Sequence, residues 1–212
     1  MLVKFTKDEI KHLLLSFIAV SIIFSIHLTN KFHWSINEFI PILALTLIVF
    51  VISLILRTYI QKKIALKYRY TIQYKIYSYG LIFSIITMIF SILVLLPSYI
   101  DYGLYERMIS DNDKYKISTV GPIFNIILAV IFMIILLIIK AYASLDLVNV
   151  NFYIMLTAII GFNVNSYMAF FNMIPFVVTD GLSIFNHKTS VWIILIVISG
   201  ILTVLSFTNY LL

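Results

Sequence analysis

The chain has 212 residues, of which 62% are hydrophobic and 11% charged, and its formal net charge is +6. Soluble domains are closer to half apolar and a quarter charged, so this composition excludes an ordinary soluble protein and predicts an integral membrane protein. There is no cysteine, which excludes disulfides and thiolate metal sites. The positive charge fits basic cytoplasmic loops better than a nucleic-acid surface, so we expect no nucleic-acid partner.

Apolar stretches recur along the whole chain, and about 20 apolar residues suffice for a helix to span a bilayer. The charged start "MLVKFTKDEIKH" is followed by no small-residue cleavage site, which argues against a cleavable signal peptide. We expect one α-helical polytopic membrane domain over residues 1–212, surrounded by the lipid bilayer. The six predicted spans are roughly 13–28, 39–60, 79–97, 119–140, 150–174 and 190–211.

The charges between these spans are unevenly distributed. Segment 57–75 has no acidic residue, and the N-terminus is also lysine-rich. Because Lys and Arg accumulate in cytoplasmic loops, we predict a multi-pass protein of the cell membrane with both segments cytoplasmic. The basic residues of this segment are Arg57, Lys62, Lys63, Lys67, Arg69 and Lys75.

Two segments between spans have the alternating pattern of β-strands. In residues 68–77, "YRYTIQYKIY", aromatic and β-branched residues alternate with polar ones. In residues 99–118, two similar runs flank "DNDK", which is typical of a turn. We therefore predict a small β-sheet or hairpin at the membrane surface.

The fourth predicted span opens with "VGPIFN". Pro122 is expected in the first helical turn, where a missing N–H does no harm. Gly121 would allow a close backbone approach, and Asn125 would project one turn further in. Taken alone, this group is also compatible with a helix start and an amide that bonds to a neighbouring helix.

The fifth predicted span is interrupted by polar residues. It contains Asn163, Asn165 and Asn172, and Pro175 is expected to break the helix. Asp180 follows after extended chain. An aspartate there either binds a cation, pairs with a base, or has reached the membrane interface.

The segments "GPIFN" (121–125) and "NMIPFVVTDG" (172–181) together resemble motifs of the site-2 protease family of intramembrane zinc metalloproteases. The basic stretch after the second span, the surface hairpin and the "VWIILIV" final span are similar to archaeal members, so the resemblance covers nearly the whole chain. The motif positions implied by the resemblance are Gly121, Pro122, Asn125, Asn172, Pro175, Asp180 and Gly181.

The family's chemistry uses a His-Glu-x-x-His helix, whose two histidines bind zinc and whose glutamate activates water. The resemblance makes Asp180 the third zinc ligand. The matching helix positions, "RTYIQ" (57–61), have Arg57 and Gln61 for the histidines and Thr58 for the glutamate. Arginine has no lone pair for a metal, and glutamine is a weak ligand. We therefore expect no intact catalytic residue and no cofactor, with zinc only if the site is unorthodox.

None of the four histidines is predicted to replace the missing ligands. His12, in "DEIKH", lies on a charged helix start, and His27 and His33 flank the far end of the first span. His187 is the one histidine expected near Asp180, and an interfacial role is the simpler interpretation.

Arg57 has two interpretations. It would pair with Asp180, with Gln61 hydrogen-bonding the same cluster, so that an ionic cluster replaces zinc. Alternatively, its side chain extends to the cytoplasmic interface beside Lys62 and Lys63.

Three functions follow from these patterns. The first is a catalytically inactive site-2-protease-like protein, a pseudoprotease that binds or regulates a transmembrane or extended segment of a partner. The second is an active intramembrane zinc metalloprotease with an unorthodox site. The third is an ion or solute transporter, because polar groups on a broken helix also suit ion sites.

Overall fold

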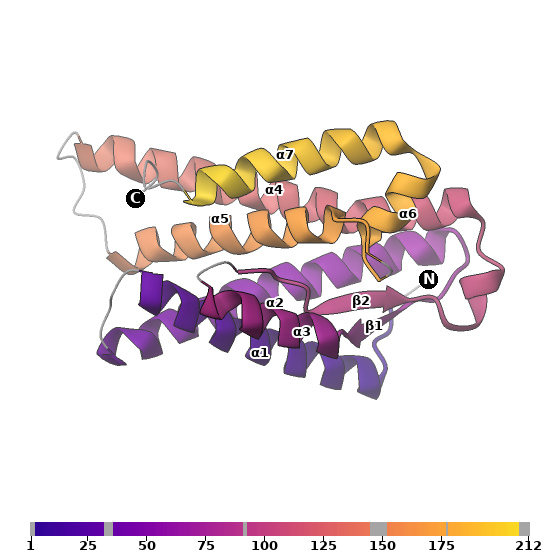
Figure 1. Cartoon of the computed structure of the whole chain (residues 1–212), viewed down its shortest axis with the longest axis horizontal. Coiled ribbons are helices and arrows are strands. Elements are labelled where there is room, and N and C mark those ends of the chain that lie inside the picture. The colour runs from indigo at the N-terminus through magenta and orange to yellow at the C-terminus, as the bar shows by residue number, and fades with distance from the viewer. Residues whose placement is uncertain (1–2, 32–35, 91–92, 145–151, 177, 208–212) are drawn as a thin grey trace.

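The computed structural model describes residues 3–31, 36–90, 93–144, 152–176 and 178–207. Most of these residues are helical (Figure 1). Five helices are long and apolar enough to cross a membrane, which supports the prediction of a membrane protein. They are α1 (Lys7–Lys31), α2 (Ile36–Lys67), α4 (Asp111–Ser144), α5 (Phe152–Met173) and α7 (Thr189–Phe207).

The predicted third span, 79–97, is not a single long helix. Helix α3 (Ser78–Ile89) has 12 residues, about 18 Å of helix, whereas the hydrocarbon core is about 30 Å thick. After α3 the chain turns back, and the N–H of Val94 donates to the Thr87 hydroxyl at 3.3 Å. Leu93 and Leu95 are then fully buried in the protein core. The count of six spans is therefore not confirmed within the described residues.

The predicted surface sheet is present but short. Strands β1 (Gln73–Ile76) and β2 (Ser98–Asp101) pair antiparallel, with Tyr74 opposite Ile100. The strand pattern predicted over 68–77 yields only these four β1 residues. The backbone at Arg69 is left-handed (φ 66°) and turns the chain after α2, so the strand begins only at Gln73.

The hairpin predicted around "DNDK" is wrong. A short 3₁₀ helix, η1 (Gly103–Arg107), follows β2, and α4 already begins at Asp111. The Ser110 hydroxyl accepts the N–H of Asp113 at 3.1 Å, and acidic side chains favour a helix N-terminus. The same residues that suit a turn therefore cap a helix here. As a consequence Pro122, expected in the first turn, lies inside α4.

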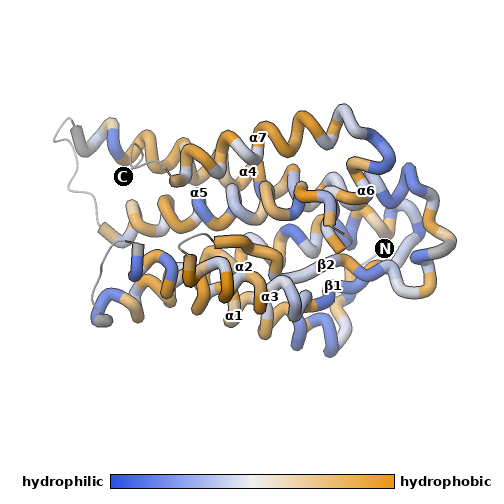
Figure 2. Tube along the Cα trace, in the orientation of Figure 1, coloured by the Kyte–Doolittle hydropathy of each residue, from blue (hydrophilic) through white to orange (hydrophobic). Residues whose placement is uncertain are grey.

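The helices form a bundle in which α5 is the central element (Figure 1). Helix α5 packs against α2, α4 and α7, while α1 packs against α2. Many large apolar side chains of the helices are exposed. Hydrophilic residues gather at the end of the bundle that holds the sheet, α6 and the start of α1 (Figure 2). Helix α6 (Asp180–His187) is the short connection between α5 and α7 at this end. It begins with the aspartate singled out in the sequence.

Candidate functional site

The guanidinium of Arg57 on α2 lies against the carboxylate of Asp180 at the start of α6. The distance from Arg57 Nη2 to Asp180 Oδ2 is 2.7 Å, and the two side chains are 7% and 8% exposed. The structure therefore agrees with the first interpretation of Arg57, in which its side chain pairs with Asp180. The pair joins residues that are 123 positions apart in the sequence.

Two amides also hydrogen-bond to this pair. Arg57 Nη2 also donates to Asn172 Oδ1 at 3.1 Å, and Gln61 Nε2 donates to Asp180 Oδ2 at 3.3 Å. The other end of the Asn172 amide donates to the Met168 carbonyl at 2.7 Å, which fixes its orientation. We call Arg57, Gln61, Asn172 and Asp180 the ionic cluster.

The break between α5 and α6 places Asp180 in the cluster. Helix α5 ends at Met173, just before Pro175, as predicted. The Thr179 hydroxyl donates to the Ile174 carbonyl at 2.6 Å and accepts the Phe176 N–H at 3.1 Å, so hydrogen bonds between residues of the turn stabilise it.

Gly181 allows α6 to lie directly against the end of α5. A Cβ atom at this position would lie 2.3 Å from the Met173 carbonyl oxygen, which is too close for any side chain. The Asp-Gly pair therefore has two tasks: the aspartate reaches the cluster, and the glycine permits the approach that puts it there.

Gly121 brings α4 close to the same cluster. A Cβ atom there would lie 2.7 Å from Gln61 Nε2 and 2.8 Å from both Arg57 Nε and Asp180 Oδ2. One turn along, Asn125 is fully buried, and neither polar atom of its amide has a hydrogen-bond partner among the described residues. The glycine predicted to allow close approach does so at the ionic cluster, whereas Asn125 is not hydrogen-bonded to it.

The asparagines at 163 and 165 are buried in α5, farther along the helix from its broken end. Asn165 donates to the Gly161 carbonyl of its own helix at 2.8 Å. These two residues have no recorded hydrogen bond to the ionic cluster, and a role in helix packing accounts for their burial.

Burial raises the pKa of the Asp180 carboxyl above its ordinary value, because the charged form loses hydration. The positive charge of Arg57, together with hydrogen bonds from Arg57 and Gln61, acts in the opposite direction. Arg57 is thus the main group that favours an ionised Asp180.

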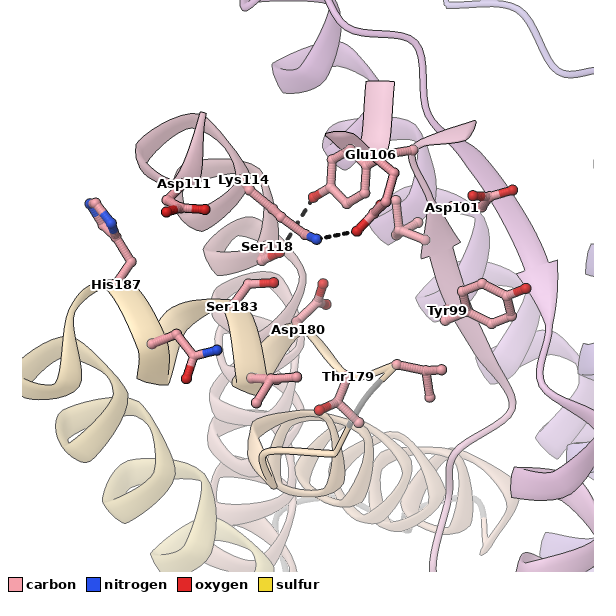
Figure 3. A pocket seen from close by; sticks show the side chains of 15 residues that line it. Tyr99, Asp101, Glu106, Asp111, Lys114, Ser118, Thr179, Asp180, Ser183 and His187 are labelled. Atoms are coloured by element: carbon pink, nitrogen blue, oxygen red, sulfur yellow. Dashed lines mark hydrogen bonds and ion pairs between the residues drawn. The ribbon is translucent and has the colours of Figure 1, made fainter. Parts of the chain in front are cut away.

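Asp180 also forms part of the wall of a polar cleft of about 420 Å³ (Figure 3). Strand β2, the start of α4 and α6 form the other walls. Within it, Lys114 pairs with Glu106, and the Tyr102 and Ser118 hydroxyls lie 3.4 Å apart. Burial raises the pKa of Tyr102, so its hydroxyl stays protonated. On the Arg57 side of Asp180, a cavity of about 10 Å³ borders Thr58 and Tyr74, roughly the space of one water molecule.

Apart from Asp180 and His187, sequence patterns did not identify the residues of this cleft. Tyr102, Glu106, Lys114 and Ser118 all fall in 99–118, where a hairpin was predicted. Contacts between the η1 segment and the start of α4 bring them together, and no local spacing indicates this.

The histidines do not assemble around Asp180. His187 lines the outer end of the cleft and points away from Asp180 (Figure 3), with its ring 5.2 Å from that of Tyr115. His12 and His27 belong to α1, and His33 lies outside the described residues. Within the described part of the chain, no group of three or more His, Cys, Asp or Glu side chains could hold a metal ion.

The donors at the cluster do not fit a catalytic zinc ion. Such an ion takes three protein ligands, usually His, Asp, Glu or Cys, and keeps one position for water. Here Asp180 is accompanied by a guanidinium, an amide and the buried Thr58. The guanidinium is cationic and contacts the one carboxylate, so it would repel a metal ion and compete for its ligand.

A comparison with known proteins gives one distant relative. A curated protein of Methanocaldococcus jannaschii, named "Putative zinc metalloprotease MJ0611", is 27% identical over 192 residues, which cover 90% of each chain. No protein-family model matches the sequence, and no solved structure matches it. The similarity supports a relationship to a protein named as a zinc metalloprotease, over nearly the full length of both chains.

Proposed function

We propose that this chain is a site-2-protease-like membrane protein that binds a partner segment without cleaving it. The ion pair of Arg57 with Asp180 carries the proposal, because the resemblance puts the zinc ligands at these two positions. Zinc-dependent hydrolysis needs a Lewis acid and a general base. At the position of the base, Thr58 has a hydroxyl that does not accept protons at neutral pH.

The proposed partner is an extended or transmembrane protein segment, and strand β2 is its proposed docking edge. One edge of β2 pairs with β1, and the outer edge of β1 is occupied, since the Tyr74 N–H donates to Glu9 at 3.0 Å. Tyr99, Ile100 and Asp101 of β2 line the cleft that ends at Asp180. An added strand would gain main-chain hydrogen bonds and place its side chains in this cleft.

The experiment is metal analysis of the purified full-length protein after equilibration with zinc, together with a peptidase assay on unfolded membrane-segment substrates. We expect less than about 0.1 zinc per chain and no cleavage, since two of the three ligands that such a site requires are missing. Stoichiometric zinc that is lost on Asp180→Ala would overturn the proposal.

The partner role is tested separately. A photo-crosslinking amino acid at Tyr99, on β2, should capture a supplied extended peptide, and the same group at the exposed Tyr153 on α5 should not. Equal capture at both positions would mean that β2 is not a docking edge.

The alternative of an active zinc metalloprotease is favoured by the name of the Methanocaldococcus relative. It requires Arg57 to leave Asp180 and a further ligand to approach. The metal analysis above distinguishes it directly. A transporter role is tested by ion or solute flux in proteoliposomes, where we expect none.

We further propose that the N-terminus and segment 57–75 face the cytoplasm. In the structure, the start of α1 and the end of α2 lie at the same end of the bundle (Figure 1). Labelling of single cysteines at Lys7 and Lys67 in intact cells should therefore fail for both, and labelling of either from outside would contradict this orientation.

A further inference from the structure

A second hollow lies on the outer surface of the bundle, between α2 and α4. This groove has a volume of about 420 Å³ and shares none of its lining residues with the cleft at Asp180. Its walls are mainly apolar. They are formed by Ile60, Tyr115, Lys116, Thr119, Val120, Ile123, Phe124 and Ile127.

The α4 wall runs from a charged end to an apolar end. Lys116, Val120, Ile123 and Ile127 recur at intervals of three or four residues, so they share one face of the helix. The distance along the axis from Lys116 to Ile127 is about 16 Å at 1.5 Å per residue. Because α4 is long and apolar enough to cross a membrane, this face passes from the polar end into hydrocarbon.

The α2 wall also runs from a charged end to an apolar end. Lys63 and Lys67 follow Ile60 at helical spacing, and both lysines are exposed. The Lys116 ammonium lies 5.2 Å from the centre of the Tyr68 ring, at the end of α2, which brings the basic residues of the two helices together. Lys63, Lys67 and Lys116 have no ion-pair partner in the described part of the chain.

Two acidic residues, Asp111 and Asp113, lie in the first turn of α4, close to Lys116 in the chain. Asp113, in the first turn of α4, accepts a hydrogen bond from the Tyr70 hydroxyl at 3.3 Å. It is opposed by the three lysines and by Arg69, which is also exposed. The mouth of the groove therefore has an excess of positive charge.

We infer that the groove binds an anionic membrane phospholipid. The headgroup phosphate contacts Lys63, Lys67 and Lys116, and an acyl chain lies along Ile123 and Ile127. The pattern of a basic mouth above an apolar groove between two membrane-spanning helices matches this ligand in both its parts. A free phosphate would use only the lysines. This site is separate from the ionic cluster and from the function proposed for it.

The test measures binding of phosphatidylglycerol and of zwitterionic phosphatidylcholine to the detergent-solubilised full chain by native mass spectrometry. We compare the wild type with Lys63→Gln/Lys67→Gln/Lys116→Gln. The matched control is Lys4→Gln/Lys7→Gln/Lys11→Gln, which removes the same charge from exposed lysines at the same end of the bundle. At roughly five-fold per lysine, the groove variant should bind phosphatidylglycerol at least about ten-fold more weakly, and the control should stay close to wild type.

A second pair of variants tests the apolar part of the groove without changing charge. Ile123→Trp fills the groove and should weaken phosphatidylglycerol binding several-fold, whereas Ile138→Trp, at an exposed site elsewhere on α4, should not. Three results would overturn the inference. The first is an equal loss of phosphatidylglycerol binding in the two lysine variants, and the second is equal binding of the two lipids by the wild type. The third is unchanged phosphatidylglycerol binding in Ile123→Trp together with competition by inorganic phosphate.

Discussion

Helix α2 contributes to two buried ion pairs, five residues apart, and their surroundings differ. In the first, Lys62 contacts both carboxylate oxygens of Glu9 at 2.6 and 2.7 Å. Glu9 also accepts the N–H groups of Thr6 and Tyr74 and is 1% exposed. In the second, Asp180 lies between a small cavity and the polar cleft, and Arg57 Nε has no hydrogen-bond partner among the described residues.

This difference separates a structural contact from a candidate site. The Glu9 pair joins the start of α1, the end of α2 and strand β1, and its carboxylate is fully used by these three elements. The Arg57 pair also joins helices, but it retains an unused donor and borders open space. We therefore expect the first pair to govern stability and the second to tolerate replacement.

The largest expected effect comes from rebuilding the zinc ligands at the second pair. The variant Arg57→His/Thr58→Glu/Gln61→His leaves Asp180 in place and puts two imidazoles one helical turn apart on the face that meets it. We expect it to bind about one zinc per chain, because it has the three ligands that such a site requires. Metal analysis after dialysis measures this.

The control for this variant adds Asp180→Ala. If the quadruple variant retains zinc, Asp180 does not act as a ligand. If neither the triple nor the quadruple variant binds zinc, the correspondence between "RTYIQ" and the metal-binding helix is contradicted.

The second effect is a difference between the two pairs in their contribution to folding. Lys62→Met leaves a buried carboxylate with no counter-charge and should destabilise the protein by about 3–5 kcal/mol. Arg57→Met should cost less, about 2 kcal/mol, because the cleft admits water to Asp180. Detergent denaturation followed by circular dichroism compares the free energies of unfolding.

Lys11→Met, which removes an exposed lysine of α1, is the matched control and should be within about 0.5 kcal/mol of the wild type. Equal losses in the free energy of unfolding for Lys62→Met and Arg57→Met would mean that the two pairs contribute equally to stability.

The pH dependence of Arg57→Met sharpens the same comparison. Burial raises the pKa of Asp180, and in this variant the guanidinium no longer opposes that rise. A folded-state pKa above the unfolded value means that stability is present at low pH and is lost as pH rises through the folded value. The variant should thus approach wild-type stability as pH falls through the raised folded-state pKa of Asp180. Arg57→Met/Asp180→Asn should show no such dependence, and a matching slope in it would exclude Asp180 as the source.

A smaller effect is expected at Gly121. The added methyl group of Gly121→Ala would lie within 2.8 Å of atoms of Gln61, Arg57 and Asp180, and overpacking of this kind costs about 1–3 kcal/mol. Gly200→Ala is the control, since its nearest contact would be 3.5 Å. Thermal unfolding should separate the two, and similar midpoints would show that the cluster can move aside.

The smallest effect is expected at the half-buried pair of Lys75 and Asp101, which lie 2.5 Å apart. The pKa of Asp101 is lowered: burial opposes ionisation, but hydrogen bonds from Lys75 and the Gly103 N–H and the charge of Lys75 outweigh it. Asp101→Asn should cost less than about 1 kcal/mol at neutral pH. The difference from wild type should vanish as pH falls through the lowered folded-state pKa, and a difference that persists at still lower pH would point to another cause.

The sequence by itself determined the membrane character and the break at Pro175, whereas the structure decided between the two interpretations of Arg57. The first two features depend on strong local preferences, namely apolar length and a missing N–H. At the start of α1, Thr6 and Glu9 exchange hydrogen bonds as a capping box. The sequence predictions included neither this motif nor the pairing of Glu9 with Lys62.

Only the tertiary structure decided how the third apolar stretch is used and where α4 begins. Residues 79–97 are apolar enough for a span, but α3 ends at Ile89, and Leu93 and Leu95 are buried in a core cluster with residues of α1, α2 and α5. Likewise "DNDK" suits both a turn and a helix start, and packing of α4 against α5 and α6 selects the helix. Long-range contacts decide such cases because the local preferences of the alternatives differ by less than the free energy of burying a helix face.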